Sequence, residues 1–229
     1  MPSIYKLKPA FQKLLTPVLN LLVQAGVTPN QITMAALILS VAGGLMLTFW
    51  HPGTREELTG NSVVLWLPVL LFVRMALNAL DGMLARTQEM SSRLGEILNE
   101  LGDVLSDAVL YLPLIFFVGP GILNIVLVVL FTVFAVLCEF SGVLGKAIDG
   151  ERRYQGPMGK SDRAFIVGFY GLVLYFWAGI TDLSTWIFGI TTLLMVATCI
   201  NRVINILTHP ADTEKDERKR PPGNMEEMS

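Results

Sequence analysis

Long runs of hydrophobic residues, separated by short polar stretches, dominate this chain. The first uncharged run covers residues 32–50, and further runs cover roughly 62–80, 101–118, 121–141, 164–181 and 183–203. A helix needs about 20 apolar residues to cross the hydrocarbon core of a bilayer. The pattern therefore predicts an all-α integral membrane protein with six transmembrane helices.

The segment before the first run is amphipathic. In residues 4–26 the apolar side chains recur at helical spacing, and the lysines lie largely elsewhere. This predicts a helix in the membrane interface, with a helix that packs on its own domain as the alternative. Thr28, Pro29 and Gln31 then form a helix start with a capping box. We expect an amphipathic helix at 1–27, a six-helix transmembrane domain at 28–208 and a charged flexible tail at 209–229.

Composition agrees with a membrane protein. Hydrophobic residues make up 52% of the chain and the mean hydropathy is +0.56, which exceeds the usual values for a soluble domain. Cys138 and Cys199 both lie in apolar runs. They are interpreted as small buried hydrophobic residues, because their spacing fits neither a zinc site nor a disulfide framework.

Basic residues gather on alternate connections between the runs. The three opposite connections hold only Arg55. Most of the other basic residues lie in four segments: the N-terminal segment, the connection after the second run, the connection after the fourth run, and the tail. In that order they are Lys6, Lys8 and Lys13; Arg86 and Arg93; Lys146, Arg152, Arg153, Lys160 and Arg163; and Lys215, Arg218, Lys219 and Arg220. The positive-inside rule then predicts that both termini and the connections 81–95 and 145–163 are cytoplasmic.

The stretch from Asn78 to Asp107 carries polar side chains beside sequence of membrane-spanning length, and such groups indicate function. Asn78, Asp81 and Ala85 share one helical stripe, and Asn99, Asp103 and Asp107 share another. Two adjacent helices would turn these stripes toward each other. The resulting oxygen ligands suit Mg²⁺, Mn²⁺ or Ca²⁺, and the lack of His or Cys argues against zinc.

The same stretch resembles the signature of the CDP-alcohol phosphotransferase family. Asp81-Gly82-x-x-Ala85-Arg86, a spacer and Gly95-x-x-x-Asn99-x-x-x-Asp103 are similar to D-x-x-D-G-x-x-A-R, a spacer and G-x-x-x-D-x-x-x-D. The resemblance extends to the T-P-N-x-x-T entry of the first run, which includes Thr33. The NALDG variant is similar to an uncharacterised bacterial subgroup. Asn78 and Asn99 depart from the pattern by replacing two aspartates.

The resemblance implies a membrane-embedded transferase, usually a homodimer, in the bacterial inner membrane. Such an enzyme moves the phosphatidyl group of a CDP-linked lipid, commonly CDP-diacylglycerol, to an alcohol and releases CMP, with Mg²⁺ or Mn²⁺ as cofactor and no nucleic acid partner. The resemblance makes Asp103 the general base. It assigns the metal to Asp81, Asp103, Asn78 and Asn99, and the CDP moiety to Gly82, Ala85, Arg86 and Gly95.

The asparagines leave alternatives open, because an amide oxygen coordinates a metal without neutralising its charge. One metal could bind while a second arrives with the substrate, or another acid could supply the missing charge; the candidates are Asp107, Glu96, Glu100 and Glu139. The chain could also be a catalytically impaired member that binds CDP-lipid or a partner. A small ion-coupled transporter is a further alternative, although transporters place their sites near the bilayer midplane.

Two further groups of charges carry expectations. Lys160 and Arg163 stand just before the fifth run, where the resemblance places acceptor-binding basic residues; the alternative is a solvated loop beside anionic lipid. Arg74 lies inside the second run, where an unpaired charge would be costly. We expect Arg74 to pair with Asp107 or with Glu139.

Overall fold

The computed structural model describes residues 8–90 and 92–208, and within these ranges the fold is entirely helical. The predicted tail at 209–229 lies outside the described residues. The α-helices are α1 (Lys8–Gln24), α2 (Pro29–Phe49), α3 (Ser62–Thr87), α4 (Arg93–Tyr111), α5 (Ile122–Asp149), α6 (Lys160–Phe176) and α7 (Ser184–Thr208). Short 3-10 helices, η2 (Glu56–Leu58), η3 (Leu112–Phe116) and η4 (Ala178–Leu183), stand in three connections.

Four segments of the described chain are long and apolar enough to cross a membrane. They are α2, α3, α5 and the segment Ala178–Thr208, which joins η4 to α7. The predicted third and fifth spans correspond to α4 and α6, which are shorter helices of 19 and 17 residues. Since α4 also carries the polar stripe, its composition does not mark it as a span, and α6 is shorter than each of the four spanning segments. The structure thus supports four of the six predicted spans.

Several helices extend beyond the hydrophobic runs that predicted them. Helix α3 continues to Thr87 and α4 begins at Arg93, so the connection between them is shorter than the predicted 81–95. Ser92 fixes the start of α4 because its hydroxyl accepts a hydrogen bond of 3.0 Å from the Gly95 amide. At the start of α2, the predicted capping box of Thr28 and Gln31 is confirmed. The two polar stripes are therefore helical over most of their length.

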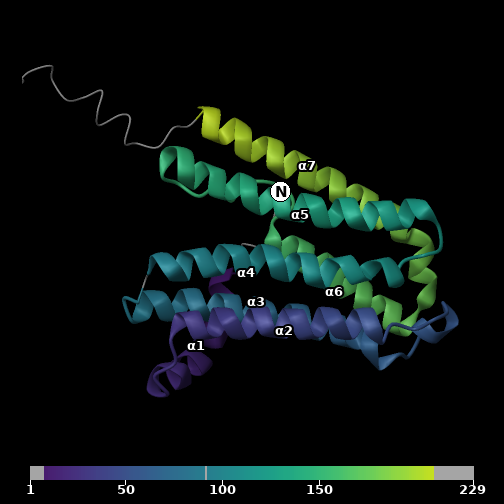
Figure 1. The fold of residues 1–229 in the computed structure, drawn as a ribbon, viewed down its shortest axis with the longest axis horizontal. Coiled ribbons are helices and arrows are strands. Elements are labelled where there is room, and N and C mark those ends of the chain that lie inside the picture. Colours follow the sequence, from purple (N-terminus) through teal and green to yellow (C-terminus); the bar gives the residue numbers. More distant parts are fainter. Residues whose placement is uncertain (1–7, 91, 209–229) are drawn as a thin grey trace, which may run out of the picture.

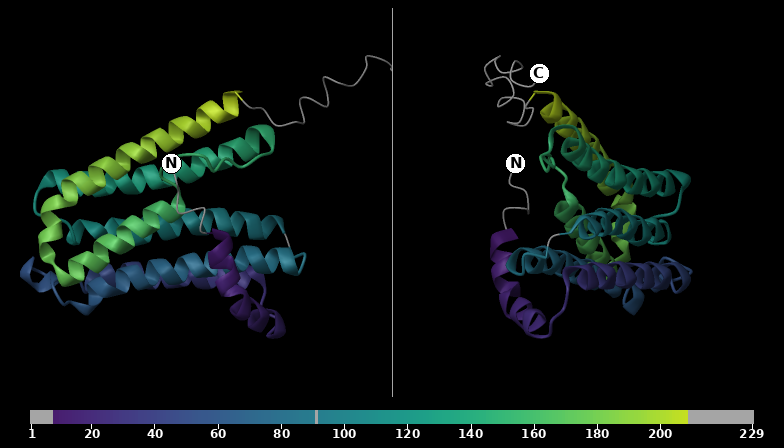
Figure 2. Two further views of the ribbon diagram at one scale, coloured as in Figure 1. Left: turned by 180° about the vertical axis from the view of Figure 1, so that it is seen from behind. Right: turned by 60° about the vertical axis from the view of Figure 1, so that its left-hand side comes forward.

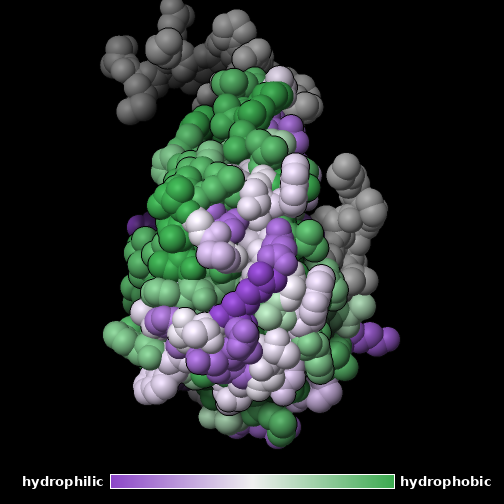
Figure 3. All heavy atoms as spheres, turned by 90° about the vertical axis from the view of Figure 1, so that its right-hand side faces the viewer, coloured by the Kyte–Doolittle hydropathy of each residue, from purple (hydrophilic) through white to green (hydrophobic). Residues whose placement is uncertain are grey.

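Helices α2 to α7 run roughly along the long axis of the molecule (Figure 1). The connections α1–α2, α3–α4 and α5–α6 lie toward one end, and the connections α2–α3, α4–α5 and α6–α7 lie at the other. The two predicted basic connections therefore share an end. Figure 3 looks onto the opposite end, where a hydrophilic band is flanked by hydrophobic surface. At that end Arg55 pairs with Asp182 at 2.6 Å.

Helix α1 lies across the bundle instead of along it (Figure 2). It packs against α3, and Leu19 of α1 shares an apolar cluster with Ile32, Leu80 and Leu84. Leu14 on another face of α1 is exposed. The predicted amphipathic helix is thus present over Lys8–Gln24 and buries one face on its own domain, and residues 1–7 of the prediction lie outside the described residues. Its position in a membrane interface remains a prediction.

Close packing of α2 against α4 depends on a glycine. A Cβ atom at Gly44 would lie 2.4 Å from the backbone oxygen of Val109 and 2.3 Å from its Cγ1 atom. No larger residue fits without moving the α4 backbone, and small residues commonly allow such approaches between membrane helices. This contact, together with the packing of α2 on α3, sets the relative positions of the two helices that carry the polar stripes.

Candidate active site

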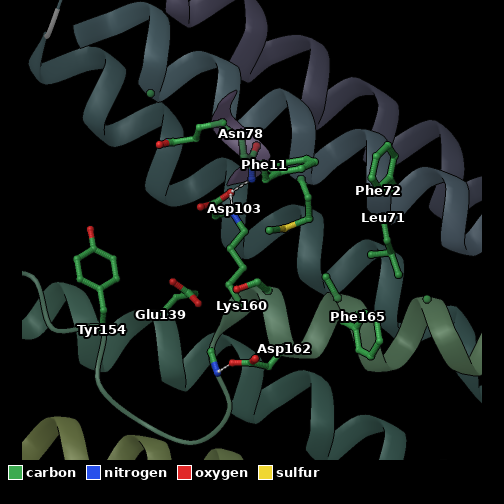
Figure 4. Close-up of a pocket in the computed structure, with 18 of the residues that line it drawn as sticks. Phe11, Leu71, Phe72, Asn78, Asp103, Glu139, Tyr154, Lys160, Asp162 and Phe165 are labelled. Carbon is green, nitrogen blue, oxygen red and sulfur yellow. Dashed lines mark hydrogen bonds and ion pairs between the residues drawn. The ribbon is translucent and has the colours of Figure 1, made fainter. Parts of the chain in front are cut away.

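A cavity of about 710 Å³ opens between the helices. Its walls come from α1, α3, α4, α5, α6 and α7 and from the α5–α6 connection. In Figure 4, Asn78, Asp103, Glu139 and Lys160 lie on one side, and the apolar side chains Leu71, Phe72 and Phe165 lie on the other. The cavity thus joins a polar region to an apolar groove.

The four residues that the sequence predicted as metal ligands all line this cavity: Asn78, Asp81, Asn99 and Asp103. The two stripes therefore face each other, as predicted. Asn78 Nδ2 donates a hydrogen bond of 2.8 Å to Asp103 Oδ1, which links α3 directly to α4. Both aspartates are buried in the protein.

Thr33 of α2 donates a hydrogen bond to the Asp81 carboxylate. Its hydroxyl lies 3.0 Å from Asp81 Oδ2 and 3.1 Å from the Pro29 carbonyl oxygen, and both oxygens are acceptors. Thr33 belongs to the helix-entry pattern of the sequence, which does not predict this contact. The missing information was the position of α2 relative to α3, which helical spacing within one segment does not supply.

Lys160, the first residue of α6, forms an ion pair with Asp103 Oδ1. The same oxygen accepts the hydrogen bond from Asn78. Asp162 stabilises the start of α6, because its carboxylate accepts a hydrogen bond of 2.9 Å from the Gly159 amide. The cap therefore fixes the helix start from which the Lys160 side chain reaches α4.

A chain of buried ion pairs lies beside the cavity. Arg74 Nη1 is 2.6 Å from Asp107 Oδ1, which confirms one of the two predicted pairs. Asp107 Oδ2 contacts Arg163 Nη2 at 3.0 Å, and Arg163 Nη2 contacts Glu139 Oε1 at 2.7 Å. Arg74 and Asp107 are 1% exposed and Arg163 is 0% exposed. Of the two predicted acceptor residues, Lys160 lines the cavity, whereas Arg163 lies in this chain behind it.

The chain of ion pairs continues into the α5–α6 connection through Arg152. This residue pairs with Glu100 of α4 and, at 2.8 Å, with Glu139 of α5. Burial favours its neutral form, but attraction to Glu100 and Glu139 outweighs burial and raises the pKa of Arg152 above its ordinary value. Its guanidinium also lies 5.3 Å from the ring centroid of Tyr154. Arg152 is therefore a fixed positive charge on the cavity wall.

The predicted nucleotide-binding residues fall into two groups. Gly82 and Arg86 line the cavity, and a Cβ atom at Gly82 would meet no atom within 4 Å. Ala85 and Gly95 are not among the lining residues. A Cβ atom at Gly95 would lie 2.8 Å from Asn30 Oδ1, so Gly95 permits the close approach of α2 to α4.

The apolar groove is formed by side chains of α1, α3 and α6. These are Phe11, Leu71, Phe72, Phe165, Phe169 and Leu172. The rings of Phe11 and Phe72 meet edge to face with their centroids 5.9 Å apart. That Phe11 reaches the site was not predictable from the sequence, because the transverse course of α1 is a tertiary feature.

The donor set of the polar region fits a divalent cation. It combines the carboxylates of Asp81 and Asp103 with the amide oxygens of Asn78 and Asn99, and hard cations such as Mg²⁺ and Mn²⁺ favour oxygen ligands of this kind. The Lys160 ammonium forms an ion pair with Asp103, so this carboxylate already has a positively charged partner in the protein. The described residues contain no cluster of three His, Cys, Asp or Glu that could hold a metal.

The fold and this site define the class of the protein. The model of the CDP-alcohol phosphatidyltransferase family matches residues 26–203. The chain belongs to this family, and its apolar helices make it a multi-pass membrane protein.

Individual relatives agree with the family match. The chain is 43% identical to inner membrane protein YnbA of Escherichia coli (strain K12), over 92% of this chain and 99% of that protein. It is 26% identical to phosphatidylinositol phosphate synthase of Mycobacterium marinum, over 90% and 84%.

Solved structures with the same fold come from Mycobacterium tuberculosis. Its phosphatidylinositol phosphate synthase with CDP-DAG bound has a TM-score of 0.66 at 19% identity, covering 95% of this chain and 99% of that one. The complex of that synthase with manganese and citrate has a TM-score of 0.66 at 20% identity and covers 93% of each chain.

Proposed function

We propose that this protein moves the phosphatidyl group of a CDP-lipid such as CDP-diacylglycerol to an alcohol and releases CMP, as a step of phospholipid biosynthesis. The observation that carries the proposal is that one cavity joins Asp81 and Asp103 to the apolar groove of α1, α3 and α6. A substrate with acyl chains and a charged nucleotide needs both regions at once. The family match and the solved relative with CDP-DAG support this substrate class.

Asp103 is the general base of the proposed reaction. It accepts the proton of the acceptor hydroxyl while that oxygen attacks the phosphorus bonded to the lipid. The bond from this phosphorus to the bridging oxygen breaks, and the oxygen leaves with CMP. A divalent cation, Mg²⁺ or Mn²⁺, held by Asp81, Asp103, Asn78 and Asn99 would neutralise charge on the transferring phosphate. Asn78 orients Asp103 through their hydrogen bond.

The nucleotide is assigned to the polar region beside α3. The open space over Gly82 allows the CDP moiety to approach the backbone, and Arg86 offers a positive charge at the same wall. Ala85 and Gly95 act indirectly in this proposal, since neither lines the cavity. Gly95 keeps α4 close to Asn30 and so keeps the wall in place.

The acceptor is proposed to carry a phosphate or another anion. Arg152, Lys160 and Arg202 line the cavity from the α5–α6 connection, α6 and α7. Arg163 supports this wall from behind by holding Glu139, which in turn holds Arg152. Phosphate groups favour such clusters of basic side chains.

The membrane arrangement completes the proposal. The protein is proposed to be a homodimer in the bacterial inner membrane. In each chain six helices, α2 to α7, cross the membrane, α1 lies in the membrane interface, and both termini are in the cytoplasm. The two basic connections at one end of the bundle support this orientation, and the Escherichia coli relative is an inner membrane protein. A site at that end lets the lipid tails remain in the bilayer while the nucleotide is in water.

A CMP-release assay tests the activity. Purified protein with Mg²⁺ or Mn²⁺ and CDP-diacylglycerol, incubated with a panel of alcohols that includes phosphorylated polyols, is expected to release CMP. Asp103→Asn should lower the rate by about 100-fold or more, because general-base catalysis contributes typically 10²–10⁴-fold. Asp182→Asn removes a carboxylate from the other end of the bundle and should leave the rate unchanged.

The assay also tests the second candidate function, a catalytically impaired member that binds CDP-lipid. The specific observation that favours it is the presence of Asn78 and Asn99, which lower the anionic charge of the donor set. Tight binding of CDP-diacylglycerol without CMP release across the whole panel would establish this alternative and refute the transferase. Ion flux into vesicles that contain the protein would instead support a transporter.

A further inference from the structure

The lining of the polar region has an unusual balance of charge. Besides Asp81 and Asp103, the acidic lining residues are Glu139 and Asp162, and the basic ones are Arg86, Arg152, Lys160 and Arg202. The lining is therefore formally neutral, with four charges of each sign. A neutral wall does not by itself attract cations. What the site can bind therefore depends on which of these charged side chains already pair with one another.

Two of the acidic side chains are already engaged. Glu139 Oε1 contacts Arg163 at 2.7 Å, and its Oε2 contacts Arg152 at 2.8 Å. Asp162 accepts the hydrogen bond that caps α6. Asp81 and Asp103 are thus the two lining carboxylates left as metal ligands, although Asp103 also pairs with Lys160 and, at 3.7 Å, with Arg74 Nη2. Neither Glu139 nor Asp162 replaces the charge that Asn78 and Asn99 lack.

Asp103 shares its charge with Lys160. Their ion pair lies in a partly enclosed place, where the side chains of Lys160 and Asp103 are 18% and 10% exposed. Attraction between opposite charges is stronger there than at a fully hydrated surface. Asn78 adds a hydrogen bond to the same oxygen, Asp103 Oδ1. An aspartate at position 78 would instead place a second negative charge beside Asp103 and repel it.

We infer that the Lys160 ammonium supplies at Asp103 the positive charge that a second metal ion would supply, and that the protein holds a single divalent cation. The inference deepens the proposed function and rests on it for the identity of the site. Asn78 and Lys160 act as a pair: the amide removes a negative charge and the ammonium neutralises another. One divalent cation on the neutral lining then matches the two ionised phosphates of a CDP-lipid.

Counting bound Mn²⁺ tests this inference without reference to activity. Purified protein in nanodiscs is titrated with Mn²⁺, and electron paramagnetic resonance of free and bound ion gives the number of sites. We expect one site per chain. In the triple variant Asn78→Asp, Asn99→Asp, Lys160→Met, we expect two sites and a spin-coupled signal. Two tight sites in the unaltered protein, or none, would overturn the inference.

Single substitutions at position 160 keep the test decisive if the triple variant does not fold. Lys160→Met removes one of the two positive charges beside Asp103 and leaves Arg74 in place, so the affinity for Mn²⁺ should rise about tenfold, as expected for the loss of a nearby like charge. Lys160→Arg retains the charge and should keep one site of similar affinity. The matched control is Lys146→Met, since Lys146 pairs with Glu96 on the surface and does not line the cavity. An unchanged or lower affinity of Lys160→Met would refute the role of the ammonium.

The outcomes separate this inference from the proposed function. A protein that binds two Mn²⁺ ions and releases CMP retains the proposed function and loses the inference. A protein that binds one Mn²⁺ ion, with the expected response to Lys160→Met, and releases no CMP retains the single-cation site and loses the transferase activity.

Discussion

The single residue Thr33 fixes the position of the Asp81 side chain. Its hydroxyl is buried between α2 and α3 and lies 3.0 Å from the Asp81 carboxylate. A ligand carboxylate whose position is fixed by a second hydrogen-bonding group loses less entropy when a metal binds. Such supporting residues typically change metal affinity by 10–100-fold.

Replacing Thr33 with Val should therefore weaken Mn²⁺ binding by about tenfold or more, because valine keeps the shape of the side chain but removes the hydroxyl donor. The measurement is the dissociation constant for Mn²⁺ in nanodiscs. Thr48→Val on the same helix is the matched control, since the Thr48 hydroxyl donates to the Gly44 carbonyl oxygen of its own helix. Equal affinity of the two variants would contradict the supporting role.

Residue-scale features were only partly predictable from the sequence. Helical periodicity placed Asn78 and Asp81 on one stripe and Asn99 and Asp103 on another, because spacing within one helix fixes its faces. The hydrogen bond from Thr33 to Asp81 joins residues 48 positions apart, and the pair of Lys160 with Asp103 joins α6 to α4. Such contacts depend on how the helices pack, which the periodicity within one helix does not predict.

At the scale of elements, buried ion pairs tie α3, α4, α5 and α6 together. Arg74 of α3 reaches Asp107 of α4, Arg163 of α6 bridges Asp107 to Glu139, and Glu139 belongs to α5. The predicted pairing of Arg74 followed from the cost of an isolated charge. The bridging position of Arg163 did not, because it lies beside a loop whose basic residues equally suit solvent or a ligand.

Replacing Arg74 with Met should lower the stability by about 3 kcal/mol, because Asp107 then keeps only its contact with Arg163 among the described residues, and the buried chain of ion pairs carries one uncompensated negative charge. Adding Asp107→Asn should recover part of the loss, since the excess negative charge is then absent. Arg74 also donates to the Asp103 carbonyl oxygen at 3.0 Å, so the rescue is partial. Thermal unfolding in detergent measures both variants.

The exposed pair of Arg55 and Asp182 provides the comparison for this experiment. Both side chains contact solvent, and surface ion pairs contribute little to stability. Arg55→Met should therefore leave the unfolding temperature unchanged. A double variant of Arg74 and Asp107 that is no more stable than the single Arg74 variant would show that the two residues are not coupled.

Gly44 allows a second test at this scale. Gly44→Ala would drive a methyl group into the Val109 carbonyl oxygen, and overpacking of this kind costs typically about 1–3 kcal/mol. Gly189→Ala on α7 is the control, because its added Cβ atom would meet nothing within 4 Å. We expect a lower unfolding temperature for the first variant and an equal or higher one for the second.

The whole molecule places the basic connections at one end and the Arg55–Asp182 pair at the other. The all-helical fold and the amphipathic first helix followed from hydrophobic patterning. The number of spans did not follow as securely, since α4 combines a polar stripe with an apolar face. Its charges are compensated within the bundle by Arg74, Lys160 and Arg152, which the sequence of α4 alone does not reveal.

Thiol labelling tests the proposed orientation of the whole molecule. Single cysteines are introduced at the exposed positions Glu56 and Glu151 of a chain in which Cys138 and Cys199 are replaced by serine. An impermeant maleimide added to intact cells should label Glu56→Cys and not Glu151→Cys, and permeabilised cells should show both. Labelling of both positions, or the reverse pattern, in intact cells would refute the six-span orientation.

The apolar groove also determines how a lipid substrate would be encountered. Phe72, Phe165 and Phe169 line the cavity and are more than half exposed on the outer surface of the described bundle, where acyl chains would surround them. A lipid could then reach Asp103 by lateral diffusion within the leaflet, without passing through water. The rate would depend on the mole fraction of CDP-lipid in the bilayer and be insensitive to its bulk concentration. Diluting the substrate with inert phospholipid at constant total substrate would therefore slow turnover.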